Sequence, residues 1–364
     1  MKVKLMTIGI ITFHRANNIG ATLQAYALQK YIDENIAECE LIDFMPNNLP
    51  QKNTKPRKLL RLCRRIITPI EYFFSQKKRA RFYTFRKQFY KLSKKEYWGD
   101  SEIRADPPRY DLLVSGSDQI FNLTLSGDSE SYYLNFIERT PKISYASSFG
   151  RTDISPHERL MIKEELVKFK KISVREESAA KIIYDEIGVN PICVADPVFL
   201  LKENFWRGLR NNKYKINGEY ILVYSMEYSE WMAKTINKAK VRYHMPIYIV
   251  CGSKSARRLN GKKLYDVGPQ EFLSLLIDAK YIITNSFHGT AFSIILMKKF
   301  WCISHSSKNT RIENILNITG NSHKLIRSDS EKLEDKIIDG EESYQKIESL
   351  IALSKQYLEK YLKI

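Results

Sequence analysis

The sequence is poor in cysteine, and the cysteines it has are not grouped. Five are spread over 364 residues, and no two of them have the spacing of a metal-binding or redox-active pair. Isolated thiols of this kind are typical of a reduced, intracellular protein and argue against a structural zinc site. We therefore expect no metal centre and no bound cofactor.

Long apolar runs are also missing. No stretch reaches the ~18 apolar residues of a membrane-spanning helix. The opening "MKVKLMTIGIITFH" has too short an apolar core, and no small-residue cleavage site, for a signal peptide. We expect a cytoplasmic protein that begins with a strand. Nucleotide-binding glycine motifs are lacking too, since "HRANNIGATLQ" (14–24) matches neither the P-loop nor the GxGxxG pattern.

What the chain has in excess is positive charge, and most of that charge is local. The formal net charge is +18, and residues 52–95 carry 16 Lys/Arg against one acid, Glu71. A nucleic-acid-binding surface would more often spread its charge around aromatic or groove-reading motifs. We therefore predict no nucleic-acid partner and look for a local explanation of this segment.

The basic segment 52–95 has a helical pattern that supports two interpretations. One helical face carries aromatic and apolar side chains, with Lys/Arg opposite: Phe82, Phe85, Phe89 and Leu92. In the first interpretation this stripe packs on the domain and the basic face is solvated. In the second, 52–95 makes peripheral contact with anionic lipid or a lipid-linked polyanion at the inner face of the membrane. The two are compatible.

Outside this segment, apolar strand patterns alternate with helical ones. "KLMTIGIITF", "ATLQAYALQKYIDEN" and "ECELIDFMP" predict a strand, a helix and a second strand, which is a βαβ unit with parallel strands. A similar series follows a polar stretch at 211–220. The sequence therefore predicts an α/β fold with two Rossmann-like domains, whose parallel sheets face a cleft. The expected divisions are 1–210, containing the basic helical insertion 52–95, then 211–340, and a C-terminal helix at 341–364.

Polar residues gather where the predicted strands end, the edge at which open parallel sheets bind ligands. Ser117 and Asp118 follow the strand in "YDLLVSGSDQIFN", and Arg175 follows the strand in "KKISVREES". Arg175 suits bidentate recognition of a carboxylate or phosphate, although an ion pair with Glu176 or Glu177 would also explain it. Asp118 fits either an Asx turn or a general acid or base.

Two further strand ends carry polar residues. His14 and Asn18 lie in the loop after the first strand and could close over a ligand. Asp196 precedes a proline and is interpreted as a turn residue.

The stretch "NSFHGTAFSIIL" holds the histidine that most suggests a ligand. His288 stands between a strand and a helix whose first N–H groups favour an anion. Ser286 and Thr290 can cap that helix or donate to an anion, and Gly289 allows a close approach to the backbone. The alternative is a histidine that caps the turn by hydrogen bonding, and the motif alone leaves both open.

Taken in order, these motifs resemble the polysaccharide pyruvyl transferase family. The resemblance spans residues 1 to about 320 and rests on the ordered set "TFHRANNIGATLQAYAL", "DLLVSGSDQIFN", "YASSFG", "SVREES", "VADPVFLL", "NSFHGTAFSIIL" and "NTRIENIL". It implies a glycosyltransferase-B-like protein with two domains. It also implies transfer of a pyruvyl group from phosphoenolpyruvate onto two hydroxyls of a sugar or lipid-linked oligosaccharide, forming a ketal during surface polysaccharide biosynthesis.

The resemblance also implies roles for individual residues. Arg175 would hold the carboxylate or phosphate of the donor, and His288 would contact the donor phosphate or act as general acid. Some members of the family have an arginine two positions before this histidine, where Ser286 stands here, and Arg311 is a candidate substitute. Ketal formation requires acid–base groups, for which His288, Asp118 and His14 are the candidates.

Two other functions compete with pyruvyl transfer. A nucleotide-sugar-dependent glycosyltransferase would have the same fold, but such enzymes often hold the donor through carboxylates of the second domain, and "TAFSIILMKKF" has none. A non-catalytic lipid- or nucleic-acid-binding protein built around 52–95 would leave the strand-end residues unexplained.

Overall fold

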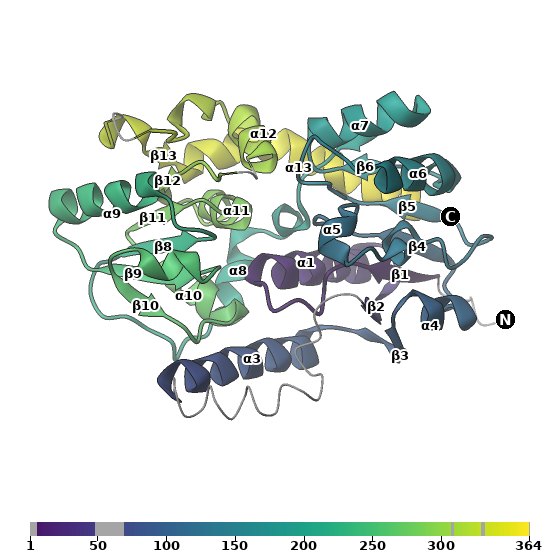
Figure 1. The fold of residues 1–364 in the computed structure, drawn as a ribbon, viewed down its shortest axis with the longest axis horizontal. Coiled ribbons are helices and arrows are strands. Elements are labelled where there is room, and N and C mark those ends of the chain that lie inside the picture. The colour runs from purple at the N-terminus through teal and green to yellow at the C-terminus, as the bar shows by residue number, and fades with distance from the viewer. Residues whose placement is uncertain (1–5, 48–68, 307–308, 329–331, 364) are drawn as a thin grey trace. The chain divides into compact units, whose positions relative to one another are not determined.

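The computed structural model describes residues 6–47, 69–306, 309–328 and 332–363. These residues belong to two compact units, whose elements are labelled in Figure 1. Unit 1 comprises Met1–Ile67, Arg86–Leu200 and Leu350–Ile364, and unit 2 comprises Thr68–Phe85 and Leu201–Ser349.

Unit 1 is built on a parallel sheet with the strand order β3-β2-β1-β4-β5. Its strands are β1 (Thr7–Ile11), β2 (Glu38–Met45), β3 (Leu92–Trp98), β4 (Leu112–Ser115) and β5 (Lys142–Ser144), with β6 (Ser173–Val174) and β7 (Ile192–Cys193) as a further parallel pair. Its helices are α1 (Ile19–Asn35), α4 (Asp100–Ala105), α5 (Leu123–Ser126), α6 (Pro156–Glu165) and α7 (Glu177–Ile187). A parallel bridge from Ser147 to Val174 places the end of β6 beside the end of β5.

The predicted βαβ unit at the start of the chain is present. Ile8, Ile10 and Ile11 of β1 are fully buried, and β1 pairs in parallel with β2. The side chain of Asn18 caps α1 by accepting from the amide of Ala21 at 3.1 Å. The polar loop between strand and helix is therefore held at the carboxyl end of β1.

The basic segment differs from its prediction at its C-terminal end. α3 (Pro69–Phe89) buries Phe82 and Phe85, as the helical stripe predicted. Leu92 is not part of that stripe, because it begins β3, so the expectation of helix up to residue 95 is wrong there. β3 is an edge strand and carries lysines, which discourage pairing with another chain. Residues 52–68 of the segment lie outside the described residues.

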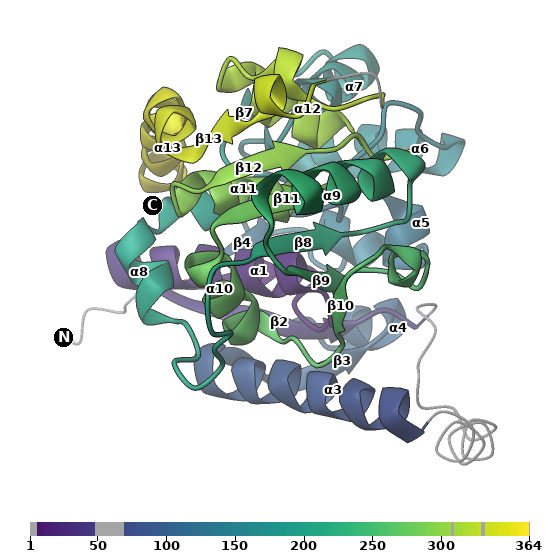
Figure 2. The ribbon, with the colours of Figure 1, turned by 90° about the vertical axis from the view of Figure 1, so that its left-hand side faces the viewer.

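Unit 2 has a sheet with the strand order β10-β9-β8-β11-β12-β13, in which only β13 is antiparallel to its neighbour. The strands are β8 (Ile221–Ser225), β9 (Ile247–Cys251), β10 (Lys262–Leu264), β11 (Tyr281–Thr284), β12 (Lys299–Cys302) and β13 (Ile338–Asp339). The helices are α8 (Glu203–Gly208), α9 (Glu230–Tyr243), α10 (Pro269–Asp278), α11 (Phe287–Ile295) and α12 (Thr310–Ile318). In Figure 2 the strands follow from β10 at the bottom to β13 at the top, with α9 in front of the sheet.

The boundary between the compact units lies ten residues before the expected division at 210. Residues 201–210 belong to unit 2 because Trp206 of α8 is fully buried and packs edge-on against Phe292 of α11, with ring centroids 4.9 Å apart. The ring of Trp206 thus fixes this segment to the second core.

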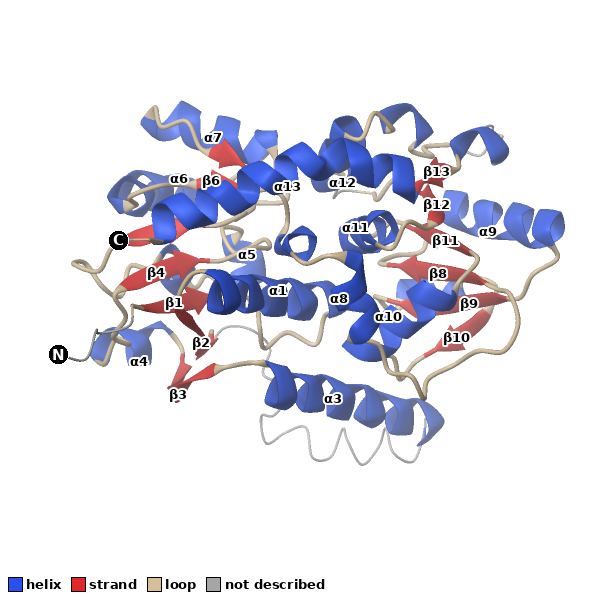
Figure 3. Ribbon diagram, turned by 180° about the vertical axis from the view of Figure 1, so that it is seen from behind, coloured by secondary structure: helices blue, strands red, loops and turns tan. Residues whose placement is uncertain are grey.

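The predicted C-terminal helix is α13 (Gly340–Leu362), which is prominent in Figure 3. Ile347, Ile351, Leu358 and Leu362 are buried, as their helical spacing predicted. Residues from Leu350 onward belong to unit 1, where Tyr357 Oη donates to the carbonyl of Ser144 at 2.9 Å. Within the described ranges, no helix is long and apolar enough to cross a membrane.

Candidate functional site

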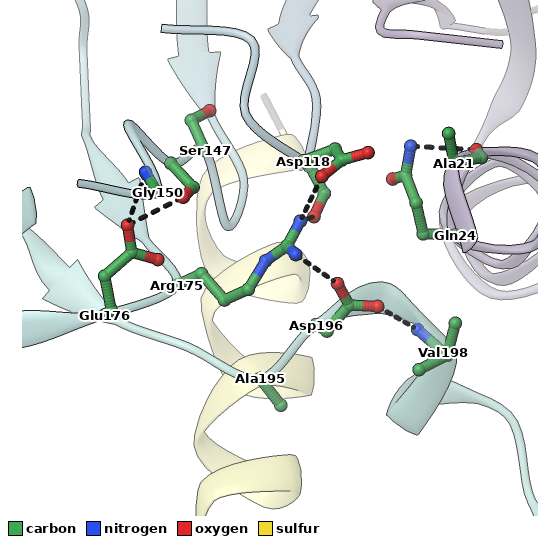
Figure 4. A network of polar contacts seen from close by, with 12 residues as sticks. Ala21, Gln24, Asp118, Ser147, Gly150, Arg175, Glu176, Ala195, Asp196 and Val198 are labelled. Atoms are coloured by element: carbon green, nitrogen blue, oxygen red, sulfur yellow. Dashed lines mark hydrogen bonds and ion pairs between the residues drawn. The ribbon is translucent and has the colours of Figure 1, made fainter. Parts of the chain in front are cut away.

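Arg175 is buried just after β6 and meets three polar side chains of unit 1 (Figure 4). Its Nη1 lies 3.1 Å from Asp196 Oδ2, and its Nη2 donates to Ser117 Oγ at 2.6 Å. The same Nη2 lies 3.8 Å from Asp118 Oδ1. Three residues singled out in the sequence, Ser117, Asp118 and Arg175, therefore come together at the carboxyl edge of the first sheet.

The carboxylates around Arg175 come from distant loops. Asp196 is the turn residue that its sequence predicted, since its Oδ1 accepts from the amide of Val198 at 3.0 Å, while its Oδ2 faces the guanidinium. Glu176, an expected partner, instead accepts from Ser148 Oγ at 2.6 Å and is turned away from the guanidinium in Figure 4. Glu176 precedes α7 and has an extended backbone, and adjacent side chains of an extended segment point to opposite sides, which explains the difference.

Asp118 has a backbone conformation that is uncommon for a residue with a side chain. Its φ is 76°, in the left-handed region. A parallel bridge to Ser147 and a hydrogen bond from the amide of Ser148 to the carbonyl of Asp118, at 3.0 Å, hold this conformation. Backbone strain of this kind clusters at functional sites, where the surrounding structure enforces it.

The charges of this cluster determine which ligands suit it. One guanidinium, that of Arg175, faces the carboxylates of Asp118 and Asp196, so the three side chains together carry no excess of positive charge. A phosphate placed here would meet two like charges, whereas sugar hydroxyls can donate to the carboxylates. The arrangement therefore suits a polyhydroxylated ligand better than it suits a free anion.

His14 is fully buried and bound on both sides of its ring. Nε2 lies 2.9 Å from Asp43 Oδ1, and Nδ1 lies 3.1 Å from the carbonyl of Thr12. Asp43 also accepts from Arg15 Nη2 at 2.6 Å. Burial raises the pKa of Asp43, but the hydrogen bonds from His14 and Arg15 outweigh it, so the net pKa lies well below the usual value. This geometry favours a structural role for His14 over proton transfer.

The loop after β1 is nevertheless tied to the Arg175 cluster. Thr12 Oγ1 donates to the carbonyl of Ser117 at 2.8 Å and accepts from Gln24 Nε2 at 3.0 Å. Asn18, by contrast, serves as the cap of α1. Thr12 and Gln24 are positioning residues that the sequence reasoning missed. Thr12 directly follows β1, so the strand-end rule applies to it. Gln24 lies on α1, the next helix, and contacts Thr12 from there.

In unit 2, His288 is the second residue of α11 and is 6% exposed. Ser286 is the cap of this helix: its Oγ accepts from the amide of Gly289 at 3.4 Å. The prediction of a histidine at the start of a helix is confirmed, and the helix begins one residue before it. The positive end of the helix dipole lies at this first turn and favours negative charge.

Gly289 and Thr290 have packing roles that the sequence did not indicate. A Cβ on Gly289 would lie 2.2 Å from Thr284 Oγ1, so close contact between helix and strand already requires glycine. Thr290 is fully buried, and its Oγ1 lies 3.4 Å from Cys302 Sγ. The missing side chain of Gly289 lets the helix approach β11, and the side chain of Thr290 packs it against β12.

Arg311 lies in the same part of unit 2 as His288. Its guanidinium carbon is 5.5 Å from the centroid of the Phe287 ring, and that ring is 5.2 Å from the His288 ring. Arg311, on α12, thus brings a cation to the start of α11, as expected if it substitutes for an arginine at position 286.

Three residues of unit 2 that the sequence reasoning did not single out surround the same turn. Asn285 is buried, its Oδ1 accepts from the amide of Met226 at 2.7 Å, and its Nδ2 has no hydrogen-bond partner among the described residues. Glu227 accepts from the amide of Ser306 at 2.6 Å and lies 3.5 Å from His305 Nε2.

These contacts join the loops that follow β8 and β12. β11 lies between those two strands, so the contacts of Glu227 span the end of β11, where α11 begins. Asn285, Glu227 and His305 each follow a strand within a few residues, so the strand-end rule applied to every strand would have found them.

The start of α11 therefore offers the parts of an anion site with acid–base groups nearby. It combines helical N–H groups, a buried amide donor on Asn285, the cation of Arg311 and the imidazoles of His288 and His305. Such a set can hold a phosphate or carboxylate and move a proton. Among the residues that the structure describes, no three His, Cys, Asp or Glu side chains group as metal ligands.

Comparison with known families gives one match. A family model described as polysaccharide pyruvyl transferase matches residues 18–307 of this chain. Among curated proteins, no sequence matches significantly.

Comparison with solved structures gives matches that cover nearly the whole chain. S. aureus MnaA, solved with UDP, is 12% identical with a TM-score of 0.52, covering 97% of this chain and 91% of its own. UDP-GlcNAc 2-epimerase from Methanocaldococcus jannaschii, solved with UDP-GlcNAc and UDP, is 14% identical with a TM-score of 0.50, covering 95% and 93%. E. coli ADP-heptose LPS heptosyltransferase II is 12% identical with a TM-score of 0.41, covering 96% and 100%. At such identities these likenesses show the fold alone, and the first two confirm the glycosyltransferase-B-like class.

Proposed function

Because the chain belongs to the polysaccharide pyruvyl transferase family, we propose that it moves a pyruvyl group from phosphoenolpyruvate onto two hydroxyls of a sugar. The product is a ketal on a surface polysaccharide or on its lipid-linked precursor. The observation that supports this proposal most is the start of α11, where His288 stands among helical N–H groups beside Arg311.

The donor fits this end of unit 2 by charge. Phosphoenolpyruvate carries a phosphate and a carboxylate, and both are stabilised by helix N-termini, amide donors and guanidinium groups. The first turn of α11 and Asn285 would hold one anionic group and Arg311 the other. Arg311 lies beside the aromatic ring of Phe287, which orients its guanidinium.

The chemistry requires a balanced movement of protons. The methylene carbon of the donor gains one proton and becomes a methyl group. Two sugar hydroxyls lose their protons as they bond to the central carbon, and phosphate leaves with its oxygen, taking up the remaining proton. In this proposal His288 delivers a proton to the donor, and His305, beside Glu227, is a second group able to accept one.

The cluster around Arg175 would serve the acceptor. Asp118, whose side chain is 14% exposed, can accept a hydrogen bond from a sugar hydroxyl and take a proton from it. In this assignment Arg175 acts through Asp118 and Asp196 by fixing their positions. We propose that the protein works in the cytoplasm, with peripheral contact at the inner face of the membrane, where lipid-linked sugars are available.

The donor assignment is tested by thermal denaturation with ligands. Phosphoenolpyruvate should raise the midpoint temperature of thermal unfolding of the wild-type protein, because a ligand that binds only the folded state stabilises that state. His288→Ala should lose most of this shift while staying folded. His323→Ala, an exposed histidine of the same unit, is the matched control and should keep the shift.

The competing function gives the opposite pattern. A nucleotide-sugar-dependent glycosyltransferase would be stabilised by UDP-sugars and not by phosphoenolpyruvate. That result would overturn the proposed donor. A full phosphoenolpyruvate response in His288→Ala would instead remove His288 from the donor site.

A further inference from the structure

Unit 2 has a surface that the proposed reaction does not use. It is formed by the first half of α3 and by residues that follow β9 and β10, almost two hundred residues later in the chain. We call it the basic-aromatic patch, and it comprises Phe73, Phe74, Lys78, Arg257, Lys263 and Tyr265.

Ring contacts make this patch continuous. The rings of Phe73 and Phe74 are 5.7 Å apart, and the ring of Phe74 is 6.3 Å from that of Tyr265. The guanidinium of Arg257 lies over Tyr265 at 5.4 Å. An aromatic surface on α3 therefore passes directly into a cationic surface on the loop after β9.

The cations of the patch act electrostatically on one thiol. Burial raises the pKa of Cys251 at the end of β9, and the charges of Arg257, Lys263 and Lys78 all oppose that rise. The neighbouring acid, Asp266, is 3.1 Å from both Lys77 Nζ and Arg81 Nη1, so its charge is already balanced by other cations. The patch thus brings the cations of Lys78, Arg257 and Lys263 to the end of β9.

The patch also exposes apolar surface. Phe73 is 63% exposed on α3, at the end of the helix where the cations gather. A large aromatic side chain held in water next to several cations is characteristic of surfaces that enter the interfacial layer of a membrane, where the ring reaches the acyl boundary and the cations meet anionic headgroups.

We propose that the basic-aromatic patch binds the surface of an anionic lipid bilayer. A bilayer suits it better than a nucleic acid does, because bases stack on open aromatic faces. Within the patch, the guanidinium of Arg257 covers a face of Tyr265, and the exposed ring is that of Phe73, which has no polar atom and suits the acyl boundary. This binding does not depend on the donor or acceptor of the reaction.

Vesicle co-sedimentation tests the patch with the full-length protein. Wild type should pellet with phosphatidylglycerol vesicles and not with phosphatidylcholine vesicles, and salt should weaken the binding. The triple variant Lys78→Gln, Arg257→Gln, Lys263→Gln should bind about 100-fold more weakly, at roughly fivefold for each cation removed near the surface. Phe73→Ser should weaken binding without any change of charge.

Matched controls come from the same unit and the same helix. Lys234→Gln, Lys238→Gln and Lys240→Gln together remove three charges from α9 and should bind as wild type does. Tyr83→Ser removes an aromatic ring of α3 that is 62% exposed but lies outside the patch, and it should also leave binding unchanged.

Three results would overturn the proposal. The first is no binding of wild type to anionic vesicles, and the second is equal loss in the patch and control variants. The third is patch-dependent binding of a short single-stranded oligonucleotide without vesicle binding. An unchanged midpoint of thermal unfolding shows that a variant is folded. If the triple variant is not folded, the vesicle binding of Phe73→Ser alone tests the proposal.

Discussion

At the scale of single residues, the most consequential feature is a buried charge that is balanced by charges far away in sequence. The side chain of Arg175 is 2% exposed and that of Asp196 is fully buried, with Nη1 and Oδ2 only 3.1 Å apart. Neither charge is solvated, so each depends on the other for its stability. Arg175 is therefore both a candidate site residue and a part of the core.

Replacing Arg175 with Met should cost about 3–5 kcal/mol in the free energy of unfolding, because it leaves a buried carboxylate without its guanidinium. Asp118→Asn, at the partly exposed carboxylate 3.8 Å from the same guanidinium, should cost less than about 1 kcal/mol. Urea denaturation measures both. Equal, small losses in the free energy of unfolding of the two variants would show that the fold does not depend on the guanidinium of Arg175.

A second residue-scale prediction concerns Asp43. Its folded-state pKa is lowered, so its ionised form contributes stability above the unfolded pKa of about 4, and that contribution is lost as the pH falls through the folded pKa. Asp43→Asn should therefore lower the free energy of unfolding by about 2–3 kcal/mol near neutral pH, and the difference from wild type should shrink in acid. A difference that stays constant with pH, measured by urea unfolding, would contradict this.

At the scale of elements, the start of α11 was the most predictable part of the candidate site. A short apolar strand, a serine and a glycine around His288 are enough to indicate a strand–helix junction. The partners of Arg175 were not predictable, because β6 and β7 are two residues long and nothing local shows that they pair. Leu92 was misassigned because helical spacing continues past Phe89, whereas pairing of the next segment with β2 decides its conformation.

The cap of α11 separates stability from ligand binding. Ser286→Ala should cost about 0.5–1 kcal/mol, because it removes the cap, and Ser286→Asp should restore that stability. The aspartate also places a negative charge where the donor anion is proposed to bind, so Ser286→Asp should bind phosphoenolpyruvate more weakly than Ser286→Ala does. Calorimetric titration beside urea unfolding tests this, and stronger binding in the aspartate variant would argue against an anion at this helix.

The C-terminal helix offers a prediction with a control on the same element. Leu358 of α13 is fully buried, whereas Leu353 is 42% exposed. Leu358→Ala should lower the free energy of unfolding by about 3 kcal/mol through lost burial and a cavity, and Leu353→Ala by less than about 1 kcal/mol. Comparable losses in the two variants would contradict the packing of α13 described above.

At the scale of the whole molecule, the sequence predicted the architecture better than the divisions within it. Alternating strand and helix patterns are enough to predict two parallel sheets, because few other arrangements bury the apolar faces of such alternating elements. The boundary could not be predicted, because it depends on which core buries Trp206, and the ring of Phe292 that receives it is distant in sequence. The same limit applies to the basic-aromatic patch, whose two halves are distant in sequence.

The chain belongs to the polysaccharide pyruvyl transferase family, and its donor is the central claim. The most direct measurement is incubation of the protein with lipid-linked glycans and phosphoenolpyruvate labelled in its three carbons, followed by mass spectrometry of the glycans. We predict that the label appears in a glycan ketal, with release of phosphate, and that His288→Ala forms no such product. Label that remains in phosphoenolpyruvate while a UDP-sugar is consumed would contradict pyruvyl transfer.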